Sequence, residues 1–176
     1  MKTRYVKTLK VFHSPLSKSG GLVVAGNMKI PCALGRTGLK YDKREGDGKT
    51  PKGVFRFHKL WWRSDKFGHP VCGLKKRRIR SQDGWCDDTN SFRYNKPVLR
   101  PFKFSHEEMH RKDHVYDFII EIGYNMNPVR RGRGSGIFLH LARKNFEPTE
   151  GCVAVPLTKI ARVLAVIGSK TQIKIS

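Results

Sequence analysis

IFLHLARKNFEPTEGCVAV, residues 137–155, contains two short apolar runs separated by a polar loop. The runs cover 137–140 and 153–155, and apolar runs bounded by polar residues are typical of short buried strands. His140 closes the first run, and Cys152 directly precedes the second. This stretch therefore predicts a strand–loop–strand unit with a histidine on one strand and a cysteine just before the other.

Cys152 and His140 are a candidate nucleophile and its base. A thiol becomes a strong nucleophile when it loses its proton, and a nearby imidazole is a common acceptor of that proton. An unperturbed cysteine titrates near ~8.5, so we expect a small downward shift to provide thiolate at neutral pH. Gly151 permits a tight backbone, which makes the amides of Gly151 and Cys152 candidate donors to an oxyanion. The pattern predicts acyl transfer through a thioester on Cys152.

The same residues also allow plainer interpretations. Cysteine is commonly buried, so Cys152 beside apolar neighbours could be a core residue. A histidine and a cysteine at this spacing are weak support by themselves, because catalytic partners meet in space rather than in sequence. A metal site made of His140, Glu150 and Cys152 lacks a fourth ligand and a recognised spacing, so we expect no metal and no cofactor.

The other three cysteines do not form a C-x-x-C pair, so a structural zinc site is not expected. Cys32 lies in an apolar run and is expected in the core. Cys72 and Cys86 could form a disulfide in an oxidising compartment, but sequence does not fix the distance between them.

Three blocks of the chain resemble a known family. They are 44–55 (REGDGKTPKGVF), 134–140 (GSGIFLH) and 149–153 (TEGCV). In order and separation these blocks are similar to those of the L,D-transpeptidase catalytic domain family (YkuD type), whose members are peptidoglycan-modifying cysteine enzymes. The resemblance covers roughly residues 5–176.

The resemblance implies a mainly β fold with short helices and some α+β character, arranged like a β-sandwich with a cleft at one end. We expect one catalytic domain over residues 1–176, with a capping insertion near 61–112. That segment holds all three tryptophans and shows little periodicity. Within it, Trp85 and Tyr94 are candidate walls of the cleft, although either could belong to a hydrophobic cluster under a loop.

The resemblance also implies a reaction on peptidoglycan stem peptides. Cys152 would attack the carbonyl of the third residue of a stem tetrapeptide, with His140 as base, and release D-alanine. An amine of a second stem would then take the acyl group, giving a 3→3 cross-link or exchange of the terminal D-amino acid. Ser135, Thr149 and Glu150 are candidates to orient His140 or bind substrate, and a backbone carbonyl could equally orient the imidazole.

Two other functions fit the same residues. Water could replace the amine, which would make the protein a carboxypeptidase or endopeptidase. Alternatively, the chain could be a non-catalytic basic module that binds nucleic acid or another polyanion, with a structural Cys152. Two departures from the family pattern bear on the outcome. Glu150 stands where many members carry a second histidine and could attract a cationic acceptor or activate water, and Ala154 stands where Arg or Asn is frequent.

The chain is strongly basic, with 36 Lys and Arg against 14 Asp and Glu and a formal net charge of +22. Such a charge favours anionic partners, nucleic acid among them. The one dense basic cluster, 75–80, comes without a zinc-finger, RNA-recognition or helix-turn-helix signature. We therefore expect the free carboxylates of stem peptides, rather than nucleic acid, as the partner.

The sequence shows no apolar run close to the ~20 residues that span a membrane, so no transmembrane segment is expected. Residues 1–10 are basic, but no apolar region of a signal peptide follows them. The substrate implied by the family places the expected site of action in the periplasm or cell wall.

Periodicity and turn signals predict the remaining elements. Strands are expected at 6–12, 21–24, 28–30, 54–57, 115–122 and 172–175. A hairpin-like turn is expected at 26–27. The capping box at 105–108 predicts a short helix to Arg111. An apolar stripe predicts a helix over 157–167, closed by Gly168.

Overall fold

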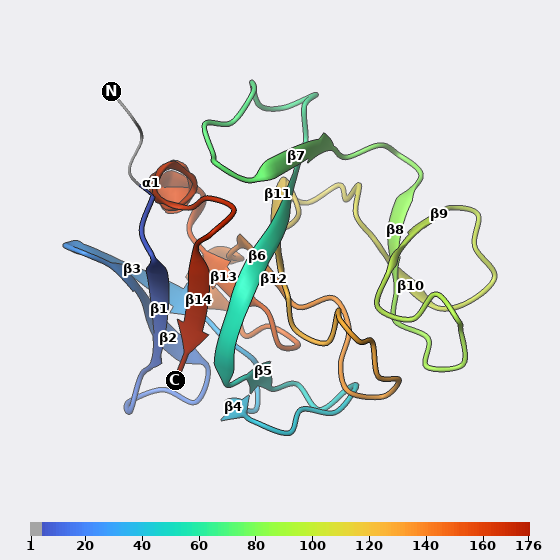
Figure 1. The fold of residues 1–176 in the computed structure, drawn as a ribbon, viewed down its shortest axis with the longest axis horizontal. Helices are drawn as coiled ribbons and strands as arrows, with labels where there is room; N and C mark the ends of the chain where they lie inside the picture. The colour runs from blue at the N-terminus through green and yellow to red at the C-terminus, as the bar shows by residue number, and fades with distance from the viewer. Residues whose placement is uncertain (1–4) are drawn as a thin grey trace.

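The described residues, 5–176 of this computed structural model, form mainly β-strands with one α-helix (Figure 1). In chain order the elements are β1 (Thr8–His13), β2 (Gly20–Ala25), β3 (Met28–Ala33), β4 (Leu39–Lys40), β5 (Thr50–Pro51), β6 (Gly53–Trp62), β7 (Lys75–Arg78), β8 (Asp83–Cys86), β9 (Pro97–Leu99), β10 (His106–Glu108), β11 (Phe118–Ile122), β12 (Phe138–Leu141), a 3-10 turn (Lys144–Phe146), β13 (Val153–Val155), α1 (Leu157–Val166) and β14 (Gln172–Ile175). The predicted mainly β class is confirmed.

The N-terminal part folds into antiparallel hairpins, as its turn signals predict. β2 and β3 pair so that Ala25 lies opposite Met28, which leaves Gly26 and Asn27 as a two-residue turn. Gly26 has φ +56°, a left-handed value that glycine adopts without steric cost. Val23 on β2 is fully buried, so this register directs the apolar face of the hairpin into the core.

Nine strands form one sheet in the order β11-β12-β13-β3-β2-β1-β14-β6-β7. β1 and β14 pair in parallel, and β14 continues antiparallel to β6. β6 also pairs with β11, which stands at the other end of this order. The sheet therefore closes on itself, and its sides face each other across one apolar core that includes residues of most of its strands.

The predicted C-terminal helix forms as α1, which lies at one end of this sheet (Figure 1), but Leu157 and Ala161 of the predicted apolar stripe are exposed. The side chains that it buries in the core are Ile160, Val163 and Leu164. Burying a side chain of this size stabilises a fold by roughly 1.5–3 kcal/mol, so the stripe holds the helix on the sheet. The helix is capped at Ile167, one residue before the predicted Gly168.

A second apolar cluster lies where the large sheet meets the segment that follows β6. Its members are Trp61, Ile79, Trp85, Met109, Val115, Tyr116, Ile119, Phe138 and Cys152. Because Phe138 and Cys152 belong to the strand–loop–strand unit of residues 137–155, this second cluster packs against that unit.

The capping insertion expected near 61–112 starts later than predicted. Trp61 and Trp62 complete β6 and pair with β11, so they belong to the large sheet. β7 also joins this sheet, as an edge strand beside β6. The part that stands apart is the three-stranded sheet β10-β8-β9, seen at the right of Figure 1.

The helix predicted from the capping box at 105–108 is wrong. These residues lead into and form β10, which pairs antiparallel with β8 and places Glu107 opposite Trp85. A local capping signal contributes only about 1 kcal/mol. Pairing with a strand distant in sequence, together with full burial of Met109 beside it, outweighs that signal.

The cysteines of the described residues are free thiols, and all four are buried. Cys72 belongs to the main core and Cys86 to the small sheet, so the disulfide considered for them is not formed. Cys32 lies in the main core, as expected. Within residues 5–176, no helix is long and apolar enough to cross a membrane.

Candidate active site

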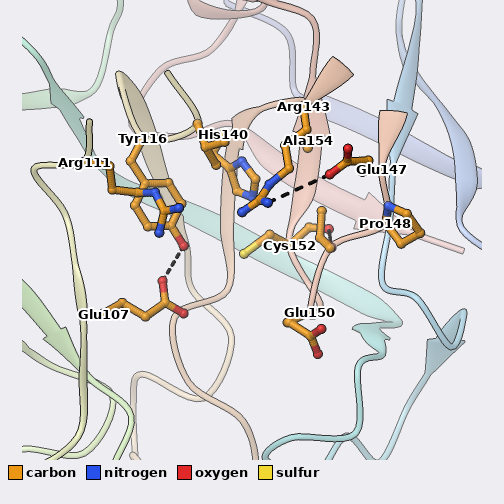
Figure 2. A pocket seen from close by; sticks show the side chains of 12 residues that line it. Glu107, Arg111, Tyr116, His140, Arg143, Glu147, Pro148, Glu150, Cys152 and Ala154 are labelled. Carbon is orange, nitrogen blue, oxygen red and sulfur yellow. Dashed lines mark hydrogen bonds and ion pairs between the residues drawn. The ribbon is translucent and has the colours of Figure 1, made fainter. Parts of the chain in front are cut away.

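The strand–loop–strand unit brings the candidate nucleophile and base together. β12 and β13 pair in parallel, with Leu139 opposite Val153 and His140 opposite Ala154. Cys152 therefore enters β13 beside the strand that carries His140. Both side chains line one pocket of about 300 Å³ (Figure 2).

The Cys152 thiol is nearly buried, and its hydrogen bonds run to the backbone of the β12 segment. Its Sγ donates to the Gly136 carbonyl at 3.2 Å, and the Phe138 N–H donates to Sγ at 3.3 Å. Burial raises the pKa of Cys152 to about 12, and the negative charge of Glu107 adds to the rise. The downward shift expected from the sequence is therefore wrong for the free protein, whose thiol is neutral at pH 7.

The imidazole of His140 is held by a backbone carbonyl. Its Nδ1 lies 2.9 Å from the Leu141 oxygen. A carbonyl can only accept, so Nδ1 carries the proton and Nε2 keeps the lone pair that a base needs. Burial lowers the pKa of His140 to about 4, so the ring is neutral at pH 7. The edge of the Tyr116 ring packs against it, with ring centroids 5.3 Å apart.

The turn before Cys152 requires glycine. Gly151 has φ +141°, and a Cβ built there would lie 2.7 Å from the Lys49 carbonyl oxygen. Thr149 Oγ1 accepts the Gly151 N–H at 3.1 Å and donates to the Cys152 carbonyl at 2.7 Å. Of the two candidate oxyanion donors, the Gly151 amide is thus engaged by a side chain in this structure. The Cys152 amide has no side-chain partner within residues 5–176.

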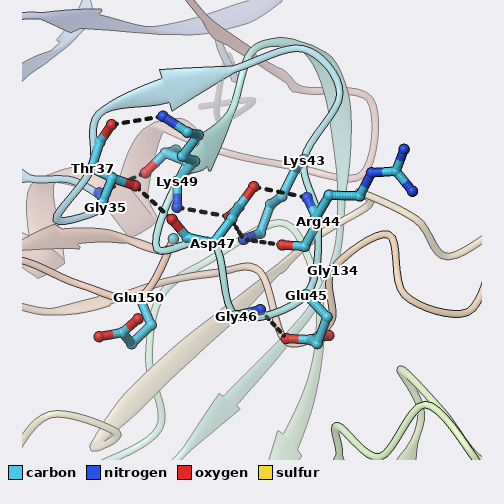
Figure 3. A network of polar contacts seen from close by, with 12 residues as sticks. Gly35, Thr37, Lys43, Arg44, Glu45, Gly46, Asp47, Lys49, Gly134 and Glu150 are labelled. Carbon is cyan, nitrogen blue, oxygen red and sulfur yellow. Dashed lines mark hydrogen bonds and ion pairs between the residues drawn. The ribbon is translucent and has the colours of Figure 1, made fainter.

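The block at 44–55 lies behind this turn and braces it (Figure 3). Asp47 accepts the Arg44 N–H at 2.8 Å, the Lys49 N–H at 2.9 Å and Lys43 Nζ at 2.7 Å. Burial acts to raise the pKa of Asp47, but these three donors hold it below its usual value. Thr50 Oγ1 lies 3.5 Å from the Cys152 carbonyl. The block therefore supports the turn at Cys152 from outside the pocket.

Two pocket residues from the insertion were not anticipated from the sequence. Glu107 on β10 and Arg111 after it line the same pocket as Cys152. Tyr116 donates its hydroxyl hydrogen bond to Glu107 Oε2, and the Arg111 guanidinium stands over the Tyr116 ring, 5.3 Å from its centroid. Burial raises the pKa of the Glu107 carboxyl and, more strongly, that of Tyr116.

No sequence signal pointed to this group. Glu107 stands in the segment interpreted as a helix cap, and only the pairing of β10 with β8 carries it to the pocket. Tyr116 precedes β11 in a stretch that was interpreted as an ordinary strand. A search for the charged residues of the insertion would have found Glu107 among many others without distinguishing it.

The mouth of the pocket carries a second arginine, Arg143, in the loop between β12 and β13. Its Nη1 lies 3.9 Å from Glu147 Oε2, and both side chains are about half exposed, at 51% and 59%. At that distance and exposure the pair is weak. Arg143 therefore remains accessible to an anionic group that enters the pocket.

The sequence-predicted candidates divide into pocket residues and supporting residues. Thr149 and Glu150 line the pocket. The Glu150 carboxylate is 75% exposed and pairs with Arg36 Nε at 3.0 Å, so it points away from Cys152 (Figure 2). It therefore forms no metal site with His140, and within residues 5–176 no three metal-ligating side chains come together.

Ser135, Trp85 and Tyr94 do not line the pocket. Trp85 is almost fully buried, donates to Asn95 Oδ1 at 3.0 Å and packs edge-on against Phe138. Ser135 and Tyr94 both donate to Glu45 Oε2, at 2.7 and 2.5 Å. These three residues support the glycine-rich approach to β12 rather than the wall of the cleft.

The fold and the site define a closed β-sheet protein with a cysteine–histidine pair in a pocket. The family model of the L,D-transpeptidase catalytic domain (YkuD) matches residues 19–175, so the chain belongs to this family. Its members are cysteine enzymes that act on peptidoglycan.

Among curated proteins, none matches the chain significantly. Among solved structures, the crystal structure of Mycobacterium tuberculosis L,D-transpeptidase 1 is similar at 13% sequence identity, with a TM-score of 0.39. That alignment covers 96% of this chain and 61% of the mycobacterial chain, so the present chain spans less than two thirds of that structure.

Proposed function

We propose that the protein is a peptidoglycan L,D-transpeptidase that carries its acyl group as a thioester on Cys152. One observation carries the proposal: Cys152 and His140 line one pocket, and a carbonyl holds the Nδ1 proton of His140, in a chain of this family. A core cysteine without a chemical role would not need a neighbouring imidazole whose tautomer is fixed by a carbonyl.

The first half of the reaction begins from a neutral pair. Sγ attacks the carbonyl carbon of the third residue of a stem tetrapeptide, and His140 Nε2 takes the thiol proton as the S–C bond forms. The C–N bond to the terminal D-alanine then breaks, and His140 returns the proton to the leaving amine. Because burial favours the neutral thiol and the neutral imidazole, we expect proton transfer to accompany attack rather than to precede it.

The oxyanion of each tetrahedral intermediate needs donors close to Cys152. The Cys152 amide is the first candidate, and the Gly151 amide becomes a second if it leaves Thr149 Oγ1. Losing one such donor typically costs about 2.7–4 kcal/mol in barrier. Arg143 at the mouth of the pocket offers a positive charge for a carboxylate of the donor stem. It would replace the Arg or Asn that is frequent in the family at the position of Ala154.

In the second half, an amine of another stem attacks the thioester and forms the new amide. This gives a 3→3 cross-link, or exchange of the terminal D-amino acid when a free D-amino acid is the acceptor. The substrate lies outside the cytoplasmic membrane, so we propose the periplasm or cell wall as the site of action.

The test is incubation of the protein with a disaccharide-tetrapeptide, followed by mass spectrometry of the products. We expect free D-alanine together with an amide-linked dimer whose linkage is mapped by fragmentation. D-alanine with free tripeptide alone, even in excess amine, would instead assign a hydrolase. Unchanged tetrapeptide under all conditions, with tight retention on polyanions, would assign a non-catalytic binding module.

A further inference from the structure

Three glutamates line the active-site pocket, and their partners differ. Glu150 pairs with Arg36, and Glu147 pairs loosely with Arg143. Glu107 instead receives a hydrogen bond from the neutral hydroxyl of Tyr116. Among the described residues it is the pocket carboxylate without a direct cationic partner. A half-buried carboxylate in this situation is a site that a ligand cation would complete.

The position of Glu107 relates it directly to the nucleophile. Tyr116 occupies Oε2, while Oε1 lies 3.8 Å from the place where a Cβ on Gly136 would stand. The Gly136 carbonyl is the group that accepts the Cys152 thiol at 3.2 Å. The carboxylate and the sulfur therefore flank the same glycine, and in Figure 2 the sulfur points toward the space between Tyr116 and Glu107.

Tyr116 fixes this carboxylate relative to the base. Its ring packs edge-on against His140 at 5.3 Å and against Phe138 at 6.1 Å between centroids. The Tyr116 hydroxyl is thus held by the same strand that carries the imidazole. Glu107, bound to that hydroxyl, keeps a defined place on the side of Cys152 away from Glu150.

We infer that Glu107 is the binding site for the ammonium group of the acyl acceptor and takes the first proton from it. The inference rests on the proposed transpeptidase function and names the residue that favours an amine over water in its second half-reaction. An aliphatic amine has an unperturbed pKa near ~10.4, so it arrives as a cation at neutral pH. The cation must be bound and then deprotonated before it can attack.

The acceptor step releases one proton overall. The ammonium passes one proton to the Glu107 carboxylate and becomes a neutral amine. Its nitrogen attacks the thioester carbon, the N–C bond forms, and the C–S bond breaks with its electron pair passing to Cys152 Sγ. His140 moves the second nitrogen proton to the sulfur, and Glu107 releases the first proton to solvent. The products are the amide, the neutral thiol and one proton.

Two properties of the site agree with this role. Burial holds the pKa of Glu107 above its usual value, which makes it a better proton acceptor than an exposed carboxylate. The same carboxylate raises the pKa of Cys152, so the two groups interact electrostatically across the pocket.

The experiment compares Glu107→Gln with Glu108→Gln. Both substitutions remove one negative charge from β10, but Glu108 is exposed, pairs with Arg100 and does not line this pocket. Each protein is given a disaccharide-tetrapeptide donor and a free diamine acceptor. Two quantities are measured in one reaction: D-alanine release, which reports the thioester step, and the ratio of amide product to free tripeptide.

We expect Glu107→Gln to form the thioester and release D-alanine. Its ratio of transfer to hydrolysis should be roughly 10–100-fold lower than that of the parent protein, which corresponds to the free energy of one charge-assisted hydrogen bond. Its transfer rate should rise steeply with pH up to the pKa of the amine, because it must use amine that is already neutral. Glu108→Gln should keep the ratio of the parent protein. Glu107→Asp retains the charge and should keep a preference for amine, which covers the case in which the glutamine variant does not fold.

A wild-type ratio and pH profile in Glu107→Gln would overturn the inference, as would equal effects of the two glutamine variants. Failure of the proposed function has a different signature, because the parent protein itself would then give no amide product from any donor.

Discussion

The two walls of the pocket are built differently. The sheet wall consists of His140 on β12 and Cys152 just before β13, and main-chain groups fix both: the carbonyls of Leu141 and Gly136 and an amide on β12. The insertion wall consists of Glu107, which is held by the Tyr116 hydroxyl, and Arg111, which pairs with Asp113 and stands over the Tyr116 ring.

This contrast separates properties that the fold itself fixes from properties that single side chains set. Main-chain contacts survive most side-chain changes, so the sheet wall should provide the step that every turnover requires. Side-chain contacts change with single substitutions, so the insertion wall should tune which acceptor is used. Damage to the sheet wall should therefore abolish chemistry, whereas damage to the insertion wall should redirect it.

The largest effect is expected at the sheet wall from Cys152→Ala. Without Sγ no thioester can form, so D-alanine release should fall below detection. Carbapenems acylate enzymes of this family, and a covalent adduct on the parent protein should disappear in this variant when measured by intact-mass spectrometry.

The matched control is Cys32→Ala, which removes a buried thiol from the main core. It should retain the adduct and the activity while lowering the melting temperature. If Cys152→Ala keeps its activity, or loses its fold while Cys32→Ala does not, Cys152 is a structural residue.

The second largest loss of activity is expected from a substitution of His140. His140→Gln removes the general base and should lower the acylation rate by roughly 10²–10⁴-fold. The proposed mechanism uses the neutral imidazole, and burial lowers the pKa of His140 to about 4. The acid limb of the pH–rate profile should therefore lie near that value. An acid limb between pH 6 and 7, the range of an unperturbed histidine, would contradict the neutral pair.

The same pKa shift affects stability with a defined sign. In the unfolded chain the imidazole binds a proton below about pH 6.5, while in the folded protein it remains neutral until about pH 4. The free energy of unfolding should therefore fall as pH decreases through this window. Circular dichroism at each pH separates this loss of fold from a loss of catalysis.

Local signals in the sequence predicted the strands of the sheet wall, and the resemblance to the family singled out His140 and Cys152 on them. The turn at 26–27, the helix stripe at 157–167 and the two apolar runs around His140 and Cys152 all depend on neighbours in sequence. These patterns place the strands, and the parallel pairing of β12 with β13 then brings the two side chains to one pocket.

The insertion wall could not be predicted in this way. Glu107 reaches the pocket through pairing of β10 with β8, and the local signal at that position favoured a helix. Burial was also misjudged, because a pattern of residue types does not show how completely the protein surrounds a thiol. The pKa of Cys152 therefore rises where a fall was expected.

A smaller effect is expected from Glu150→Gln, which sharpens the contrast with Glu107. The Glu150 carboxylate is exposed and paired with Arg36, and it points away from the sulfur. Exposed pairs of this kind contribute about 0–1 kcal/mol. The ratio of transfer to hydrolysis should change less than about fivefold. A loss comparable to that of Glu107→Gln would assign acceptor binding to the β12–β13 loop instead.

The smallest effect on chemistry is expected from the basic cluster at 75–80, which lies outside both walls. Arg77 pairs with Asp83 and stacks on Trp61 at 4.3 Å, so it should be left intact. Neutralising the exposed Lys75, Arg78 and Arg80 as a triple glutamine variant should leave acylation by a carbapenem unchanged. It should weaken binding to anionic cell-wall sacculi and flatten its salt dependence, because long-range attraction is screened within about 10 Å at 0.1 M salt. Sedimentation with sacculi at two salt concentrations measures this, and unchanged binding would exclude the cluster from substrate attraction.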